Sequence, residues 1–140
     1  MSCIFCKIIN GHAPGFVLYR DEFVVVFLSL EGHPLVVPVK HVASLAELDD
    51  DIGAALFKCA MTIARALPAA TKCDGLNLIL SDGEAAGQDV FHLHLHVKPR
   101  WSHDAVTLTW DTKPLSVEER RAIASNIEAY LPKTPFKPFE

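Results

Sequence analysis

The sequence predicts an α+β fold in a single domain over residues 1–140. Two observations carry this prediction: short runs rich in Val, Phe and Leu alternate with turn residues, and two longer stretches repeat apolar residues at helical spacing. A chain of 140 residues is long enough for one domain with its own core. The hydrophobic share of 50% and the charged share of 21% are typical of a folded rather than a disordered chain.

Six segments have the composition of strands. Residues 16–20 and 23–28 are separated by an acidic turn, and Pro38 places residues 35–39 at a strand end or a sheet edge, because proline cannot donate to a strand ladder. The complete set of predicted strands is 16–20, 23–28, 35–39, 76–80, 90–98 and 106–110.

Two segments predict helices. The first runs from Asp49 to about residue 67, where acids at its start suit the positive end of a helix and Pro68 is expected to end it. Its apolar stripe consists of Ile52, Leu56, Cys59, Ile63 and Leu67. The second begins at the capping box Ser116–Glu119 and runs to about residue 131. We expect its inward-facing residues to be Ile123, Ile127 and Leu131.

Charge and hydropathy exclude several classes of function. The net charge is −4 and no basic run of five residues exists, which argues against binding to duplex nucleic acid but leaves room for a small anionic ligand. The first twelve residues lack the apolar core of a signal peptide, and no run of 18 apolar residues exists. We therefore expect a cytoplasmic protein without a membrane span, whose thiols stay reduced.

The four cysteines need an explanation other than disulfides. Cys3 and Cys6 form a C-x-x-C pair, which is half of a zinc site by spacing, although two free buried thiols remain the alternative. Cys59 falls on the apolar stripe of the first helix and is expected to act as a small hydrophobe. Cys73 is expected to be a turn residue without a role, and His12 and His103 are expected at the surface.

The stretch HLHLHV carries the strongest chemical signal. Side chains alternate between the faces of a strand, so His92, His94 and His96 are expected on one face. The other face would carry the core residues Phe91, Leu93, Leu95 and Val97. Three imidazoles on one face can bind a catalytic zinc ion or carry out nucleophilic and acid–base chemistry on a phosphoryl group. The glycine-containing loop 83–88 directly before them favours the phosphoryl group, because glycine lets backbone N–H groups approach an anion.

The chain resembles the histidine triad (HIT) family. The resemblance is carried by AGQDVFHLHLHVKPR, by CIFCKIINGHAPGFVLYRDE at the start and by GHPLVVPVKHVASLAEL. It implies a single domain of this family, in which an antiparallel sheet of about five strands is combined with two main helices, commonly as a homodimer. It further implies a nucleotide hydrolase or nucleotidyl transferase that cleaves at the α-phosphate of nucleoside phosphoramidates or dinucleoside polyphosphates.

The resemblance assigns roles to single residues. His94 would attack the α-phosphorus and form a covalent nucleotidyl-histidine, oriented by the backbone carbonyl of His92. His96 would contact the phosphate and help the leaving group, and His33 would support the site. Gln88 and Gly87 match the phosphate-contact loop, and Phe27 and Leu30 match the base pocket.

A structural zinc ion is the cofactor that the resemblance implies. In similar bacterial members the C-x-x-C pair is completed by two histidines, which correspond here to His41 and His92. The resulting set of Cys3, Cys6, His41 and His92 would be closed and therefore structural, and no catalytic metal is expected.

Four positions depart from the family pattern. Ser29 stands where an Asp usually holds the ribose hydroxyls, and the connection from Ser29 to His33 is about four residues shorter than usual. Ser81 replaces an Asn that contacts phosphate. Asp89 follows Gly87-Gln88, and we expect its carboxylate to point away and only its backbone N–H to face phosphate. Lys98 lies on the strand face of the histidines, either as a solvated residue or as one that attracts phosphate.

Two other functions remain open, the first of them because of the altered ribose position and the shortened loop. One is a non-catalytic relative that binds a nucleotide or a protein partner and retains the triad. The other, a hydrolase with three histidines on zinc, requires an open metal site.

Overall fold

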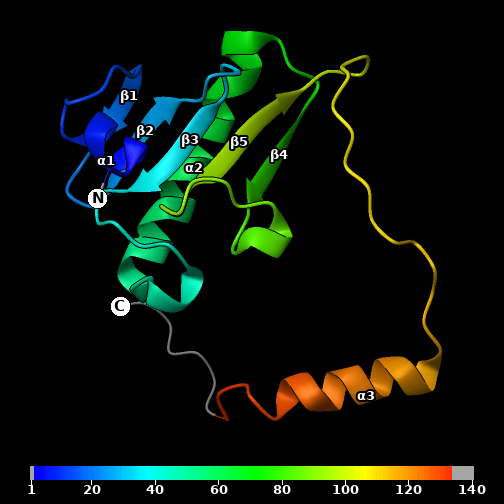
Figure 1. Ribbon diagram of the computed structural model, residues 1–140. Helices are drawn as coiled ribbons and strands as arrows, with labels where there is room; N and C mark the ends of the chain where they lie inside the picture. Colours follow the sequence, from blue (N-terminus) through cyan, green and yellow to red (C-terminus); the bar gives the residue numbers. More distant parts are fainter. Residues whose placement is uncertain (1, 134–140) are drawn as a thin grey trace. The chain divides into compact units, whose positions relative to one another are not determined.

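The computed structural model describes residues 2–133. The chain divides into two compact units, and the boundary between them along the sequence falls between Val106 and Thr107. The first unit contains all of the sheet and two of the three α-helices (Figure 1). Its elements are α1 (Ile4–Ile9), β1 (Val17–Arg20), β2 (Val24–Leu28), β3 (Pro34–Pro38), α2 (Asp50–Thr71), β4 (Gly75–Leu80) and β5 (Leu95–Arg100). Short 3-10 turns lie at Leu45–Glu47 and Glu84–Ala86.

The five strands form one antiparallel sheet in the order β1-β2-β3-β5-β4. Neighbouring strands along the chain pair as hairpins, except that β5 inserts between β3 and β4. In this register Phe27, Leu35 and His96 are successive partners across β2, β3 and β5, so their side chains share one face of the sheet. The predicted α+β class with five antiparallel strands is confirmed.

Each face of the sheet carries its own apolar cluster. One face packs against α2, whose buried positions are Ile52, Leu56, Ala60 and Leu67. Cys59 and Cys73 are partly buried against the same cluster, so Cys59 acts as the small hydrophobe that the helical stripe predicts. The other face packs against α1 through Phe5 and Ile9. The short α1 covers only part of its face, which leaves room for the histidines beside it.

The helix α2 extends further than the sequence predicts. Pro68 lies inside it, and the helix ends one turn later, at Lys72, in the left-handed conformation (φ 58°). The Lys72 N–H donates to the Pro68 carbonyl, so the last turn is closed despite the proline. Among the described residues α2 is the one helix long and apolar enough to cross a membrane, but its apolar stripe packs on the sheet as that of a core helix.

Two predicted strands are wrong in whole or in part. Residues 91–94 are not in the sheet, since the Leu93 N–H donates to the Val42 carbonyl at 2.8 Å instead of to a strand partner. Residues 106–110 form no strand either. Their alternating pattern finds no ladder partner among residues 2–133. The helix α1 was not predicted at all, because six residues are too few for a periodic pattern.

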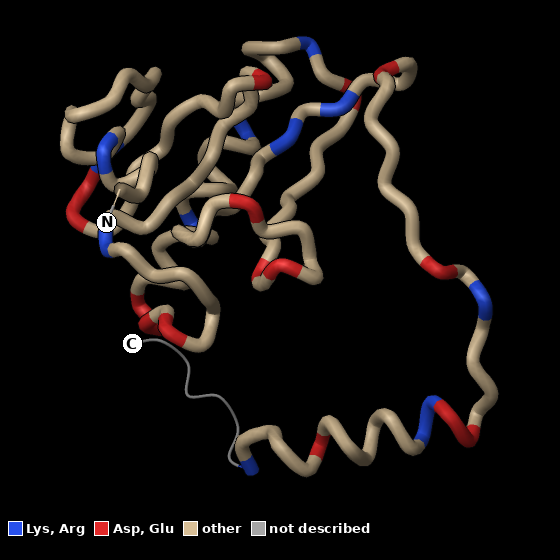
Figure 2. Tube along the Cα trace, viewed as in Figure 1, with Lys and Arg blue, Asp and Glu red and all other residues tan. Residues whose placement is uncertain are grey.

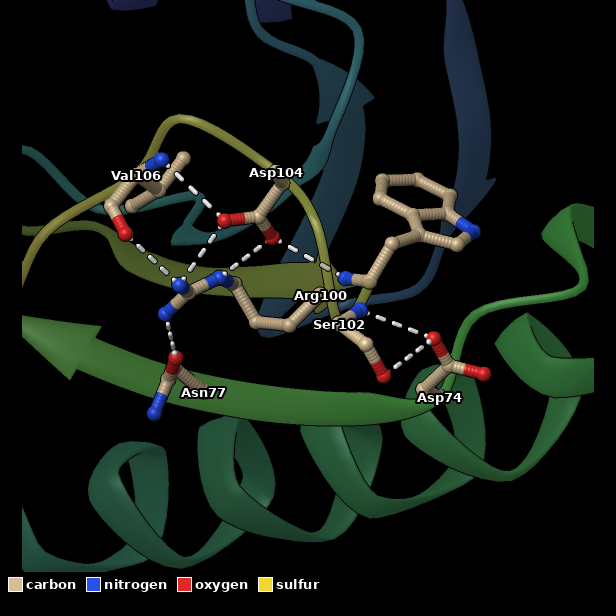
Figure 3. Close-up of polar contacts among 7 residues, drawn as sticks. Asp74, Asn77, Arg100, Ser102, Asp104 and Val106 are labelled. Atoms are coloured by element: carbon tan, nitrogen blue, oxygen red, sulfur yellow. Dashed lines mark hydrogen bonds and ion pairs between the residues drawn. The ribbon is translucent and has the colours of Figure 1, made fainter.

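A polar clamp fixes the end of β5 to β4 (Figure 3). The Arg100 guanidinium makes two hydrogen bonds to the Asp104 carboxylate, at 2.8 and 2.9 Å, and a third to Asn77 on β4 at 2.7 Å. It also donates to the Val106 carbonyl at 2.8 Å. Its hydrogen bonds hold the pKa of Asp104 well below its usual range. The clamp thus ties residues 104–106, the last of the first unit, to the end of β5.

The second unit consists of an irregular segment and α3 (Val117–Glu128). The predicted capping box is present, because the Ser116 hydroxyl accepts from the Glu119 N–H and the Glu119 carboxylate accepts from the Ser116 N–H. The expectation that Ile123, Ile127 and Leu131 face inward is wrong, since all three are exposed and α3 has no buried residue. The pattern of α3 is amphipathic, but among residues 107–133 of its own unit the helix buries no apolar side chain.

Candidate active site and metal centre

The three triad histidines lie at the start of β5, but they do not form the uniform row that the sequence predicts. His92 and His94 precede the strand and are buried, while His96 is in it and half-buried. Leu93 and Val97 are fully buried, as expected of the opposite face. Phe91 is 51% exposed, so its assignment to the core is wrong. The bend at 91–94 is the reason, because alternation between faces holds only within the strand.

The His94 ring has a fixed orientation. Its Nδ1 donates to the backbone carbonyl of His92 at 2.8 Å, and its ring packs edge-on against Phe5 at 5.0 Å between centroids. A carbonyl oxygen only accepts, so Nδ1 carries the proton, and Nε2 of the neutral ring carries the lone pair. The contact between His92 and His94 is the one that the resemblance implies.

His33 and His96 form a second pair beside His94. Nε2 of His33 lies 2.8 Å from Nδ1 of His96, and Nδ1 of His33 lies 3.1 Å from the Ser29 hydroxyl. Burial, together with the nearby His94 and His33, lowers the pKa of His96 to about 4. Burial and then Lys98 lower the pKa of His33, against the opposing effect of Glu31. Both rings are therefore neutral near pH 7.

The loop before the triad is held by one buried side chain. The Gln88 carbonyl oxygen accepts from the Gly83 N–H at 2.8 Å, and its amide group donates to the carbonyls of Ala43 and Val90. Gly83 and Gly87 have φ angles of 92° and 89°, which favour glycine. Since the Gln88 side chain is committed to the loop, only backbone groups of this segment remain for an anion.

The remaining predicted binding residues are scattered around this face. Phe27 is buried beside Phe5, Ser81 is half-buried, and Leu30 is fully exposed at the hairpin tip. Asp89 is exposed and its carboxylate accepts from the Val90 N–H at 2.9 Å. Their contacts with substrate stay predictions. His12 and His103 are exposed, as predicted.

Four side chains form a metal-binding cluster. The ligand atoms of Cys3, Cys6, His41 and His92 all lie within 4.8 Å of one another. The two Nδ1 atoms of His41 and His92 are 3.2 Å apart, and the sulfur–nitrogen distances are 3.3 Å (Cys6 to His41), 3.5 Å (Cys6 to His92) and 3.6 Å (Cys3 to His92). Ligands on a tetrahedral zinc ion stand about 3.3 Å apart for two nitrogens and about 3.6 Å for sulfur and nitrogen. The donor set and its spacing therefore fit zinc.

The second nitrogen of His92 supports this fit. Nε2 lies 2.8 Å from the Pro38 carbonyl and donates to it, so Nδ1 in the neutral ring is unprotonated and free to bind a metal. Burial lowers the pKa of His92, and His41 and His94 lower it further, against the Pro38 hydrogen bond. The cluster borders a depression of about 510 Å³, and Cys3, Cys6 and His41 are among the residues that line it.

Sequence reasoning missed two contributors to this site. Phe5 of α1 contacts both His92 and His94, and the Pro38 carbonyl fixes the His92 ring. The C-x-x-C pair was the available signal for α1. If Cys3 and Cys6 bind the same metal ion as His92, the chain between the two cysteines must form a tight turn. No pattern in the sequence identifies a backbone carbonyl as a partner.

Comparisons with known proteins agree with this geometry. The family model described as HIT domain matches residues 10–103. Protein hit of Bacillus subtilis is 40% identical over 116 residues, covering 79% of this chain and 80% of the relative. Adenylylsulfatase HINT3 of Arabidopsis thaliana is 37% identical over 109 residues, covering 75% of this chain and 55% of the relative.

Three solved structures are similar along most of the chain. The crystal structure of a HIT family member from Bacillus subtilis has a TM-score of 0.88 at 36% identity and covers 96% of this chain and 100% of its own. A Zn-bound histidine triad family protein from Mycobacterium smegmatis has a TM-score of 0.72 at 36% identity, with coverages of 92% and 98%. A histidine triad nucleotide-binding protein from Candida albicans has a TM-score of 0.81 at 25% identity, with coverages of 91% and 96%.

Proposed function

Because the chain belongs to the HIT domain family, we propose that it is a nucleotide hydrolase or nucleotidyl transferase acting through a covalent nucleotidyl intermediate on His94. The substrates that we propose are nucleoside phosphoramidates and dinucleoside polyphosphates, cleaved at the α-phosphate. The Arabidopsis relative that is named an adenylylsulfatase and the Candida relative that is named nucleotide-binding support a nucleotide substrate.

The orientation of His94 is the observation that carries this proposal. The hydrogen bond from Nδ1 to the His92 carbonyl leaves Nε2 as the nucleophilic atom and holds the ring in one rotamer. A buried histidine whose role was structural would satisfy both ring nitrogens within the protein. Nε2 of His94 has no hydrogen-bond partner among the described residues, which suits an atom that must reach a phosphorus.

The proposed reaction consists of two displacements at the α-phosphorus. In the first, Nε2 of His94 attacks the α-phosphorus and the bond to the leaving group breaks. His96 passes its Nε2 proton to the leaving group and takes one at Nδ1 from His33, which takes one at its own Nδ1 from the solvent side, so both rings stay neutral; the second step reverses these transfers. In the second, a water oxygen attacks the same phosphorus, the nitrogen–phosphorus bond breaks, and the water proton goes to His96. The mononucleotide leaves and His94 regains its lone pair.

A trapping experiment tests this mechanism. Wild type and His94→Ala are incubated with an adenosine phosphoramidate or a diadenosine polyphosphate, quenched in mild base and weighed intact, and AMP release is assayed. We expect a nucleotidyl adduct and AMP with wild type and neither with His94→Ala. His103→Ala, at an exposed position, is the matched control and should retain both. A folded, zinc-loaded wild type that binds AMP but gives neither adduct nor AMP release would favour the binding-protein alternative.

The geometry does not favour a hydrolase with zinc on the three triad histidines. Nδ1 of His92 faces the cysteines, Nδ1 of His94 donates to a carbonyl and Nδ1 of His96 faces His33. The three rings thus direct these nitrogens to three different partners rather than to one point.

We also propose that Cys3, Cys6, His41 and His92 hold a structural zinc ion. The tetrahedral spacing of the donors supports this proposal, and the Zn-bound relative from Mycobacterium smegmatis agrees with it. Elemental analysis of the purified protein should give one zinc per chain, and Cys6→Ser with His41→Ala should give none. A wild type that takes up no zinc at micromolar concentration would instead leave Cys3 and Cys6 as free thiols.

A cytoplasmic homodimer completes the proposal. The exposed apolar residues of α3, Ile123 and Ile127 among them, support a partner chain, because an isolated 12-residue helix is marginal in water. Lys and Arg residues are spread along the described chain without a basic block, which supports a small ligand rather than duplex nucleic acid (Figure 2). Light scattering on the purified protein should give twice the chain mass of 15.4 kDa.

A further inference from the structure

The shortened connection between β2 and β3 brings Ser29 opposite His33. The Ser29 N–H donates to the His33 carbonyl at 2.8 Å, which closes a three-residue loop, Leu30 to Gly32. Gly32 ends this loop with a φ of 88°, as a tight hairpin of this length requires. Directly opposite residues of a hairpin have their side chains on the same face, about 5 Å apart. The tight turn therefore places the Ser29 hydroxyl against the His33 ring.

The Ser29 hydroxyl has two contacts with His33. Its oxygen accepts from the His33 backbone N–H at 3.2 Å and lies 3.1 Å from Nδ1 of the ring. The opposite ring nitrogen, Nε2, lies 2.8 Å from Nδ1 of His96. Ser29, His33 and His96 thus form a continuous chain of hydrogen-bonding atoms that runs from the half-exposed hairpin to the triad.

Only two proton arrangements satisfy this chain when both rings are neutral. In the first, the Ser29 hydroxyl donates to Nδ1 of His33, Nε2–H of His33 donates to Nδ1 of His96, and His96 carries its proton on Nε2. In the second, every proton is reversed, and Nε2 of His96 is a base. Since the Ser29 oxygen already accepts from the backbone, its own proton is free to donate to the ring, which favours the first arrangement in the resting protein.

We propose that Ser29 is a positioning residue that sets the tautomers of His33 and His96 and supplies the proton that His96 gives to the leaving group. This proposal rests on the proposed function. As His96 loses its Nε2 proton it gains one at Nδ1 from His33, and His33 gains one at Nδ1 from Ser29, which takes a proton from solvent. Neither imidazole ring becomes an anion during these transfers, and the protons end in the second arrangement.

The attacking water of the second step restores the first arrangement. It gives its proton to Nε2 of His96, the chain of protons moves back, and Ser29 returns one proton to solvent. The pKa of Glu31 is lowered by its own backbone N–H and then by the Ser29 side chain, which indicates a carboxylate beside this outlet.

The tautomers can be measured without any substrate. Long-range nitrogen-15 NMR of the zinc-loaded, ligand-free protein at pH 7.5 should show His33 and His96 as Nε2–H tautomers in wild type and in Ser29→Thr, which keeps a hydroxyl. Ser29→Ala should leave His33 in a mixture of tautomers. A wild-type His33 that carries its proton on Nδ1, or a Ser29→Ala spectrum identical to wild type, would overturn the proposal.

Two substrates with different leaving groups separate proton supply from binding. An alkylamine leaving group needs a proton, whereas the p-nitrophenolate of an AMP ester does not. With the phosphoramidate, Ser29→Ala should lower kcat roughly 10- to 100-fold with KM nearly unchanged. With the p-nitrophenyl ester the loss should stay below about threefold. Ser29→Thr should restore the amine reaction, and Ser125→Ala, exposed on α3, should behave as wild type.

The outcomes distinguish this proposal from its premise. An equal rise in KM for both substrates would show that Ser29 binds the ribose instead, and the proton role would be overturned. A wild type that cleaves neither substrate would refute the proposed function, while the NMR tautomers would still decide whether Ser29 orients His33.

Discussion

The backbone carbonyl of His92 accepts the hydrogen bond that orients His94, while the ring of the same His92 faces Cys3 and Cys6. One residue thus belongs to the metal cluster through its side chain and to the nucleophile through its backbone. A change in the cluster should therefore reach His94 without any direct contact between the metal ligands and substrate.

Loss of one zinc ligand should lower turnover more than substrate binding. In Cys6→Ser the His92 ring keeps its hydrogen bond to the Pro38 carbonyl but loses its tie to the metal cluster, and the carbonyl that orients His94 becomes more mobile. We expect kcat to fall at least roughly tenfold with a smaller change in KM, because a misoriented His94 less often reaches the phosphorus in the geometry that the reaction needs. Thermal unfolding should shift down by at least about 5 °C, which corresponds to roughly 1 kcal/mol. Cys59→Ala, on α2 and outside the cluster, is the control; equal losses in both variants would contradict the coupling.

Lys98 should favour substrates whose leaving group is anionic. It lies on the same strand face as His96, and its charge is among the causes that lower the pKa of His33 and of Glu31. Lys98→Gln should raise KM for a diadenosine polyphosphate about two- to fivefold, because a partly exposed charge contributes up to about 1 kcal/mol. KM for a phosphoramidate with a neutral amine leaving group should change less. High salt should reduce the difference in polyphosphate KM between wild type and Lys98→Gln. Lys58→Gln, at an exposed position of α2, is the control. The same rise in KM in this variant would show that Lys98 has no specific role.

Stability should fall as the pH is lowered from about 6.5 towards 4. The pKa of His96 is about 4 in the folded protein, so in this window the unfolded chain binds a proton that the folded state does not. The free energy of unfolding then decreases as the pH falls, by about 1 to 2 kcal/mol for this group after allowing for its half-exposed position. Urea unfolding of wild type and His96→Gln at five pH values measures this slope. His96→Gln should have the smaller slope; an equal slope would show that other groups account for it.

Two glycine substitutions should have opposite effects. Gly87 has a φ of 89°, so Gly87→Ala should strain the loop before the triad by about 1 kcal/mol and weaken substrate binding. Gly53 lies inside α2, where a Cβ would meet Leu48 only at an ordinary 3.5 Å. Gly53→Ala should therefore stabilise the protein by about 0.5 to 1 kcal/mol without altering turnover. Chemical unfolding and KM measurements on both variants check this, and a stabilising Gly87→Ala would contradict it.

Apart from the proposed ligands His41 and His92, which only the family resemblance assigned, the sequence by itself determined the strands β1 to β4, the start of α2, the capping box of α3, the C-x-x-C pair and the triad stretch. These features depend on local patterns, such as β-branched runs between turns, acids at a helix start and ligand spacing in the chain. The candidate site was recognisable for the same reason, since HLHLHV and the C-x-x-C pair are short and contiguous.

Only the tertiary structure decided which atoms meet. The bend at 91–94 arises because the Leu93 N–H pairs with the carbonyl of Val42, a residue 51 positions earlier. The helix α2 continues one turn past Pro68, and the Lys72 N–H closes that turn on the Pro68 carbonyl. The same is true of Ser29, whose departure from the family pattern says nothing about a partner until the tight hairpin places it against His33. Local propensities are encoded along the chain, whereas the contacts of Leu93 with Val42 and of His33 with His96 join residues distant in sequence, and their energies exist only once the fold has closed.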